Sequence, residues 1–272
     1  MARPPLILLP PSEGKASGGR GEPWQPGSTS SPTLDVRRQQ VLVALARAMK
    51  GSGVSRAKLL GVKGVALAAA TEADLLAATA PTLPAIERYT GVLYDALAYA
   101  GRPASIRRRI DHQVRIFSGL WGMVAPRDAI PDYKLKMGAS LGRIGKLSTW
   151  WRPAITEVLA DDVAARAVWN LLPNEHAAAW APDLSGGPAS PRSVISVRFF
   201  DTVTRGGRSE LVAVAHWNKL LKGALVAHVV AEQLTDPAGL VDFVHPLGYR
   251  YAPTRTELAP DGIGVSVALV KP

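Results

Sequence analysis

Five lysines stand in short motifs where their charges could gather at one site: Lys15, Lys134, Lys136, Lys219 and Lys222. Lys134 and Lys136 are two residues apart, which places them on one side of an extended segment. Lys219 and Lys222 are three residues apart and share one face of a helix start. If these lysines converge, they form an electropositive cleft able to hold a phosphate backbone or a nucleotide. Each pair alone is more typical of a solvated surface.

A second set of side chains could carry acid–base chemistry: Ser12, Glu13, Lys15, Tyr89, Ser118, Tyr133, Asn174, Glu175 and His216. Glu175 follows a predicted strand. A carboxylate near Lys15 or Lys222 could act as a general acid or base, or form one half of a structural ion pair. If the chain is an enzyme, we expect the catalytic residues to be Lys15, Glu175, Ser118 and Tyr133.

Several familiar kinds of active site are excluded. The sequence has no GxSxG elbow, and Ser12-Glu13-Gly14-Lys15 lacks the long glycine-rich lead-in of a phosphate loop. The five histidines show no paired metal-ligand spacing, and cysteine is absent. We therefore expect neither a metal site nor a bound cofactor.

The segment LLGVKGVAL at residues 59–67 predicts two short helices joined by a tight turn. Gly61 and Gly64 would let the turn expose backbone N–H groups beside a helix N-terminus, and Lys63 adds a cation at the tip. This predicts a helix-hairpin-helix element over about residues 52–80 that contacts DNA phosphates without reading sequence. The alternative is an ordinary helical corner with a glycine C-cap.

The composition indicates a basic globular protein. The chain has 272 residues, a hydrophobic fraction of 47% and a formal net charge of +10. This charge predicts a polyanionic partner, either double-stranded DNA or another phosphate-bearing anion. The alternative is an arginine-rich composition with no specific partner. No apolar run approaches the roughly 18 residues of a membrane span, the N-terminal segment is unlike a secretory signal, and the lack of cysteine suits the cytoplasm.

Strands and helices that could position these residues follow one another along the chain. Strands are predicted at residues 6–9, 167–171, 194–200, 210–215 and 264–270, with a hairpin turn at 204–208. Helices are predicted from residue 35, at 83–100, 107–112, 155–159 and 220–233, with short helical segments within 55–80. The mixture predicts an α+β protein, a single compact domain over residues 1–272 with a mixed β-sheet surrounded by helices.

Residues 117–138, FSGLWGMVAPRDAIPDYKLKMG, are the most informative stretch, because glycines and prolines stiffen a loop among aromatic and cationic side chains. A loop that merely packs on the core is the alternative. The SGLWG and PDYKLKMG segments resemble the signature of the YaaA family of peroxide-stress proteins. The N-terminal strand and the PPSEGK segment that follows it share this resemblance. So do three further segments: NLLPNE at 170–175, WNKLLKG at 217–223 and GYRY at 248–251. Lys136 departs from the family pattern, which has an acidic residue there.

The resemblance implies a YaaA-like fold with a helix-hairpin-helix element, duplex-DNA binding and a role in the peroxide-stress response. We therefore predict a cytoplasmic DNA-binding protein whose contacts are Gly61, Lys63, Gly64, Lys134, Lys136, Lys219 and Lys222. The alternative is an enzyme of the same fold that acts on a nucleotide, nucleobase or related small anion in a cleft between Lys15 and Glu175. A deep pocket enclosing hydroxyls and carboxylates would favour the enzyme. A third hypothesis is a structural module that binds a protein partner.

Overall fold

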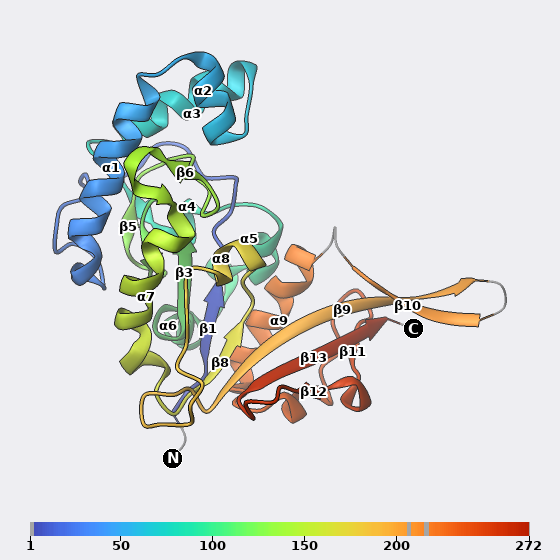
Figure 1. The fold of residues 1–272 in the computed structure, drawn as a ribbon. Coiled ribbons are helices and arrows are strands. Elements are labelled where there is room, and N and C mark those ends of the chain that lie inside the picture. The colour runs from blue at the N-terminus through green and yellow to red at the C-terminus, as the bar shows by residue number, and fades with distance from the viewer. Residues whose placement is uncertain (1–2, 206–207, 215–217, 272) are drawn as a thin grey trace.

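The structure, a computed structural model, describes residues 3–205, 208–214 and 218–271, without the side chains of residues 205, 208, 218 and 219. Its centre is a mixed sheet of nine strands within these ranges, ordered β11-β13-β9-β8-β1-β3-β4, with β10 paired to β9 and β12 to β13 (Figure 1). The five strands from β13 to β3 are parallel. Strands β4, β11 and β12 pair antiparallel at the two sides of this group, and β10 pairs antiparallel with the carboxyl-terminal half of β9. The predicted mixed sheet is therefore confirmed, with a parallel centre.

The sheet strands are β1 (Leu6–Leu9), β3 (Val114–Ser118), β4 (Gly122–Val124), β8 (Ala167–Asn170), β9 (Ser193–Arg205), β10 (Arg208–Ala213), β11 (Arg250–Tyr251), β12 (Glu257–Leu258) and β13 (Gly264–Lys271). Two small ladders pair β2 (Leu83–Pro84) with β5 (Ala129–Ile130), and β6 (Ser140–Leu141) with β7 (Gly145–Lys146). The predicted hairpin joins β9 to β10, whose ladder reaches Arg205 opposite Arg208. Its central residues, 206 and 207, lie outside the described ranges.

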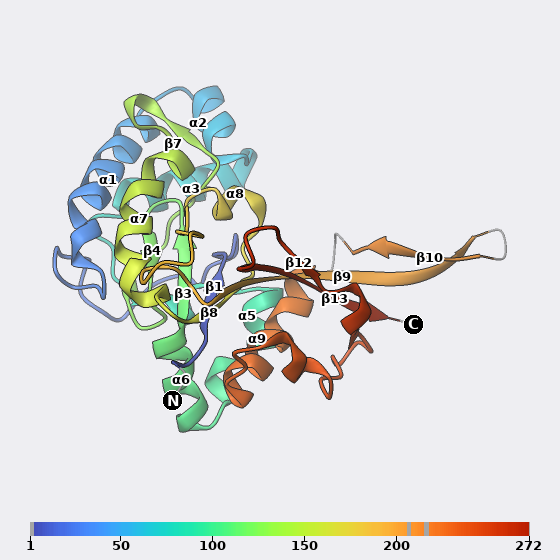
Figure 2. The same cartoon turned by 60° about the horizontal axis from the view of Figure 1, so that its bottom comes forward.

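The helices are α1 (Asp35–Met49), α2 (Gly53–Leu60), α3 (Gly64–Leu76), α4 (Ala85–Arg88), α5 (Val92–Leu97), α6 (Ala104–Gln113), α7 (Leu147–Val163), α8 (Asn174–Ala177) and α9 (Asn218–Glu232). In Figures 1 and 2, α7 lies over one face of the sheet and α5 and α9 over the other, while α2 and α3 form a separate tip beyond α1. Helices thus cover both faces of the parallel centre.

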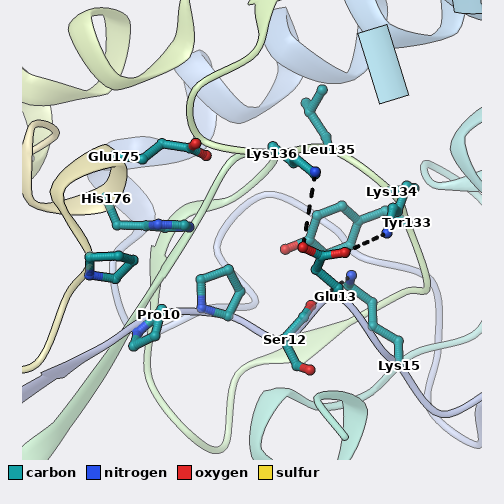
Figure 3. A pocket seen from close by; sticks show the side chains of 12 residues that line it. Pro10, Ser12, Glu13, Lys15, Tyr133, Lys134, Leu135, Lys136, Glu175 and His176 are labelled. Atoms are coloured by element: carbon teal, nitrogen blue, oxygen red, sulfur yellow. Dashed lines mark hydrogen bonds and ion pairs between the residues drawn. The ribbon is translucent and has the colours of Figure 1, made fainter. Parts of the chain in front are cut away.

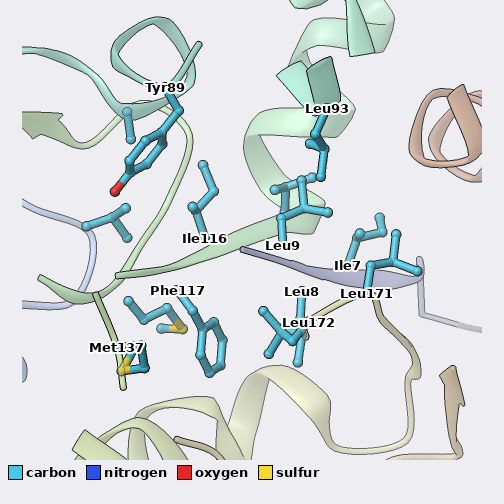
Figure 4. Packing of buried hydrophobic residues seen from close by; sticks show 14 of the residues in the cluster. Ile7, Leu8, Leu9, Tyr89, Leu93, Ile116, Phe117, Met137, Leu171 and Leu172 are labelled. Atoms are coloured by element: carbon cyan, nitrogen blue, oxygen red, sulfur yellow. The ribbon is translucent and has the colours of Figure 1, made fainter. Parts of the chain in front are cut away.

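Strand β1 shows why this centre needs two covering layers. All four of its residues are fully buried, as expected for a parallel strand between two helical layers. Because side chains alternate along a strand, Ile7 and Leu9 point toward Leu93 of α5, and Leu8 points to the opposite side with Phe117 (Figure 4). One hydrophobic cluster runs from β1 to β13.

Two predicted helices differ from the structure. Residues 83–100 do not form one helix, because Pro84 lies in strand β2 and Gly91 adopts a φ of +94° that separates α4 from α5. The helix predicted at 155–159 is instead the 17-residue helix α7, which contains Pro153. Tertiary packing outweighs the local effect of that proline. No helix in the described ranges is long and apolar enough to cross a membrane.

Candidate functional site

A cavity of about 280 Å³ opens at the carboxyl ends of β1 and β8. The chain leaves β1 for β3 on one side, whereas β8 leads to β9 on the other, so neighbouring connections diverge here. Such a switch point in a parallel sheet creates a crevice where ligands bind. The cavity is lined by Pro10, Pro11, Ser12, Glu13, Lys15, Tyr133, Lys134, Leu135, Lys136, Pro173, Glu175 and His176 (Figure 3).

The segment after β1 is fixed by contacts with the chain that precedes and begins α5. Tyr94 donates a hydrogen bond from its hydroxyl to the Pro10 carbonyl at 2.8 Å. Lys15 forms an isolated β-bridge with Tyr89, and Thr90 N–H donates to the Gly14 carbonyl. A Cβ added to Gly14 would lie 2.9 Å from the Thr90 hydroxyl oxygen, so this close approach favours glycine. The loop therefore has a defined path into the cavity.

Lys15 places its ammonium among aromatic rings inside the cavity. Its Nζ donates to the Ser12 carbonyl at 3.2 Å and lies 4.3 Å from the centre of the Tyr133 ring. Burial lowers the pKa of Lys15 to about 8, against the opposing charge of Asp132. Both protonation states are therefore accessible near neutral pH, which suits an acid–base group.

Behind the cavity wall, three hydroxyls form a buried chain. Trp121 N–H donates to Ser118 Oγ at 3.0 Å, and the Ser118 hydroxyl shares a hydrogen bond with the Tyr133 hydroxyl, 2.6 Å away. The Tyr133 hydroxyl in turn lies 2.8 Å from that of Tyr89. Burial raises the pKa of Tyr89 to about 12 and raises that of Tyr133 well above its usual value, so both hydroxyls stay protonated at neutral pH. Ser118 supports Tyr133 and is not itself a lining residue.

The signature segment presents its lysines as the sequence predicts. Tyr133 and Leu135 are buried, whereas Lys134 is partly exposed and Lys136 is exposed, which is the alternation of an extended segment. Lys134 Nζ lies 3.5 Å from one carboxylate oxygen of Glu13, and Lys136 Nζ lies 3.9 Å from the other. Figure 3 shows this carboxylate between the two ammonium groups.

Two glycines of the signature allow this segment to pack closely. A Cβ at Gly119 would lie 2.5 Å from the Leu135 carbonyl oxygen, and one at Gly138 would lie 2.6 Å from Glu175 Cδ. Glu175 Oε1 accepts a hydrogen bond from Gly138 N–H at 2.8 Å. This bond fixes the Glu175 carboxylate at the cavity wall, although the residue is exposed. Asn174 is exposed in α8 and does not line the cavity.

Helix α3 supplies a residue that sequence reasoning missed. Asp74 is 2% exposed, and its Oδ1 accepts a hydrogen bond from Lys134 N–H at 2.7 Å. Burial raises the pKa of Asp74 to about 7, against this hydrogen bond. In the sequence, the hint of this role is an aspartate within a largely apolar helical stretch. Only the fold shows that it holds the cavity segment.

Residues 59–67 contain the predicted turn between two helices, and Gly61 is the glycine C-cap of α2, with its N–H donated to the Ala57 carbonyl. Gly61 and Gly64 have φ values of +69° and +54°, and Lys63 is exposed at the turn. Ser52 caps α2 by accepting a hydrogen bond from Ser55 N–H. Lys136 Nζ lies 3.4 Å from the position of a Cβ on Gly61, so the turn adjoins the cavity mouth.

Helix α9 does not bring Lys222 into the cavity, although the sequence predicts that this lysine lines the same cleft as Lys15. Lys222 Nζ donates to the Leu171 carbonyl at 2.9 Å and does not line the cavity, and burial lowers its pKa to about 8. A Cβ on Gly223 would lie 2.3 Å from the Leu93 carbonyl oxygen, so this glycine permits the close packing of α9 on α5. The side chain of Lys219, and His216 altogether, lie outside the described residues. Within the described part of the chain, no group of three or more His, Asp or Glu side chains could hold a metal ion.

Comparison with known proteins places these motifs in a family. The family described as peroxide stress protein YaaA matches residues 6–255, which include every cavity-lining residue. A UPF0246 protein of Streptomyces coelicolor is 39% identical over 248 residues, covering 90% of this chain and 91% of the relative. A UPF0246 protein of Corynebacterium glutamicum is 33% identical over 234 residues, covering 83% and 84%. This chain therefore belongs to the YaaA family of peroxide stress proteins.

Proposed function

We propose that the cavity binds a small phosphate-bearing anion of the nucleotide class and performs acid–base chemistry on it. The observation that carries this proposal is the gathering of three lysines, two carboxylates and two hydroxyl-bearing residues in one cavity at the switch point of the sheet. A volume of about 280 Å³ lies just below the roughly 300–1,000 Å³ range of pockets for drug-sized ligands. It suits one nucleotide or a smaller anion, and a DNA duplex is too wide for it.

The residues divide into two roles. Lys15 and Glu175 are the proton-transfer candidates, because Lys15 has a pKa of about 8 and Glu175 is oriented by Gly138 N–H. Tyr133 presents its ring to Lys15, while its hydroxyl is held by Ser118 behind the cavity wall. Lys134 and Lys136 supply positive charge at the entrance. Proton transfer and anion binding are thus provided by different side chains of one cavity.

The test is calorimetric titration of adenosine 5′-monophosphate and inorganic phosphate into wild type and Lys15→Met. Removing a charged hydrogen-bond donor worth about 1.5–3 kcal/mol should weaken binding roughly 10- to 100-fold. Lys271→Met, an exposed lysine in β13, is the matched control and should bind like wild type. Glu175→Gln should retain binding yet lose turnover of any substrate found. Equal binding by Lys15→Met and wild type would contradict the proposal.

The pH dependence of binding follows from Lys15. Because its pKa is about 8, its positive charge is present below pH 8 and is lost as the pH rises through that value. A phosphate monoester becomes a dianion above its second pKa of about 6. Affinity should therefore be greatest between about pH 6 and 8. A flat profile over pH 6–10 would show that Lys15 does not contact the ligand.

Duplex-DNA binding is the second candidate, and a specific contact favours it. Lys136 Nζ lies beside Gly61, so the turn that carries the exposed Lys63 is next to the lysines of the cavity. Backbone N–H groups at the start of α3 would add phosphate contacts. In this case the α2–α3 turn acts as the helix-hairpin-helix predicted from sequence, and the protein protects DNA during peroxide stress.

Fluorescence anisotropy across a salt titration tests DNA binding, with wild type and Lys63→Glu. Each phosphate contact adds roughly 0.9 to the log–log salt slope, so the substitution should reduce both affinity and slope. Lys271→Glu again serves as the control. Weak binding that does not depend on Lys63 would leave the cavity as the functional site.

A further inference from the structure

The cavity entrance contains a carboxylate that bridges two cations. Glu13 Oε2 lies 3.5 Å from Lys134 Nζ, and Oε1 lies 3.9 Å from Lys136 Nζ. The two lysines project from the same side of the signature segment, and Glu13 comes from the loop that also carries Lys15 (Figure 3). An anion with two oxygens is thus already seated between the lysines.

The two partners of the Lys134–Glu13 ion pair differ in how firmly they are held. Lys134 is 19% exposed and its backbone is fixed by buried Asp74, whereas the Glu13 side chain is 63% exposed. Exposed ion pairs of this kind contribute only about 0–1 kcal/mol, because water and salt screen them. The cationic half of the contact is therefore anchored, and the carboxylate is its exposed half.

A phosphate monoester would gain more from the same position than Glu13 does. It has up to two negative charges and three strong acceptor oxygens near neutral pH, whereas a carboxylate has one charge. Both anions accept charge-assisted hydrogen bonds from ammonium groups, so the second charge and the additional oxygens of the phosphate make the difference. The exchange of carboxylate for phosphate therefore favours a dianion over a monoanionic phosphodiester.

We infer that Lys134 and Lys136 form a subsite for a terminal phosphate monoester, and that Glu13 occupies it as an internal competitor until the ligand arrives. This inference rests on the proposed anion-binding function and names the group that the cavity selects. Glu13 then makes the subsite selective for dianions over monoanions. Monoanions fail to displace it, and dianionic phosphate displaces it.

The experiment titrates the whole protein with inorganic phosphate, adenosine 5′-monophosphate and its methyl phosphodiester by calorimetry. Glu13→Gln removes the competing charge while keeping the size of the side chain. It should tighten phosphate and monophosphate binding about three- to tenfold and narrow the preference for monoester over diester. Lys134→Met should abolish that preference. Glu257→Gln, which also breaks an exposed ion pair, with Arg198 at 2.8 Å on the sheet, is the matched control and should change nothing.

The outcomes separate this inference from the proposed function. Monophosphate binding by wild type with no gain in Glu13→Gln would overturn the competitor role and leave the anion site intact. Equal affinity of wild type for monoester and diester would overturn the subsite. Absence of binding by all three probes in both wild type and Glu13→Gln would refute the subsite and the proposed function together.

Discussion

The cavity and the α2–α3 turn are both built around glycines, yet these glycines are needed for different reasons. At Gly119 and Gly138 in the signature, an added Cβ would lie 2.5–2.6 Å from another part of the chain. At Gly64 in the turn, nothing lies within 4 Å of such a Cβ, and only its φ of +54° favours glycine. The cavity thus depends on tertiary contacts, whereas the turn depends on local backbone conformation.

The largest expected effect compares Gly119→Ala with Gly64→Ala. The first places a methyl group against buried backbone and should reduce the free energy of unfolding by about 3 kcal/mol. The second imposes a left-handed conformation on alanine and should cost about 1 kcal/mol. Urea denaturation of both variants measures the difference. Similar losses would show that the signature backbone moves aside easily.

Asp74→Asn tests the buried carboxyl that joins the two regions. The pKa of Asp74 is raised to about 7 in the folded protein, so its contribution to stability is present below pH 4 and is lost as the pH rises through 7. Asparagine cannot ionise, and between the two pKa values the stability of wild type falls by about 1.4 kcal/mol per pH unit, so the variant should gain about 2 kcal/mol relative to wild type between pH 5 and pH 6.5. Thermal denaturation at both pH values provides the measurement. A constant difference between variant and wild type would contradict the raised pKa.

Tyr133→Phe removes the middle hydroxyl of the buried chain. Ser118 and Tyr89 would each lose a partner, so the free energy of unfolding should fall by about 1–2 kcal/mol. Chemical denaturation at pH 7 is the measurement, with Tyr251→Phe as a control at the opposite edge of the sheet, where the hydroxyl is 2.9 Å from Thr256 Oγ1. A loss no greater than that of the control would mean that the chain of buried hydroxyls contributes little to the free energy of unfolding.

The smallest effect on stability is expected at the turn itself. Val65 is 89% exposed, so Val65→Ser should change the free energy of unfolding by less than about 0.5 kcal/mol. Lys63→Glu should be equally neutral for stability while weakening DNA binding if the second candidate function holds. Denaturation and anisotropy on the same two variants separate the effects. A large loss of stability in either variant would show that the turn is packed against other parts of the protein.

The sequence by itself determined the features whose causes are local. Continuous apolar residues predicted β1, the spacing of Gly61 and Gly64 predicted the α2–α3 turn, and alternation predicted that Lys134 and Lys136 share one side. The motifs also identified the family, and they include Lys15 and Glu175, the candidate catalytic residues. These inferences depend on neighbours a few residues apart, which a sequence displays directly.

Only the tertiary structure decided which candidates meet. It brought Lys15, Glu13 and Glu175 to one switch point, placed Ser118 behind Tyr133, and bound Lys222 to the Leu171 carbonyl outside the cavity. It also introduced Asp74, 60 residues from its partner in the chain. Strand order and helix packing set these distances, and both arise from burial of the whole hydrophobic core, which no short segment encodes alone.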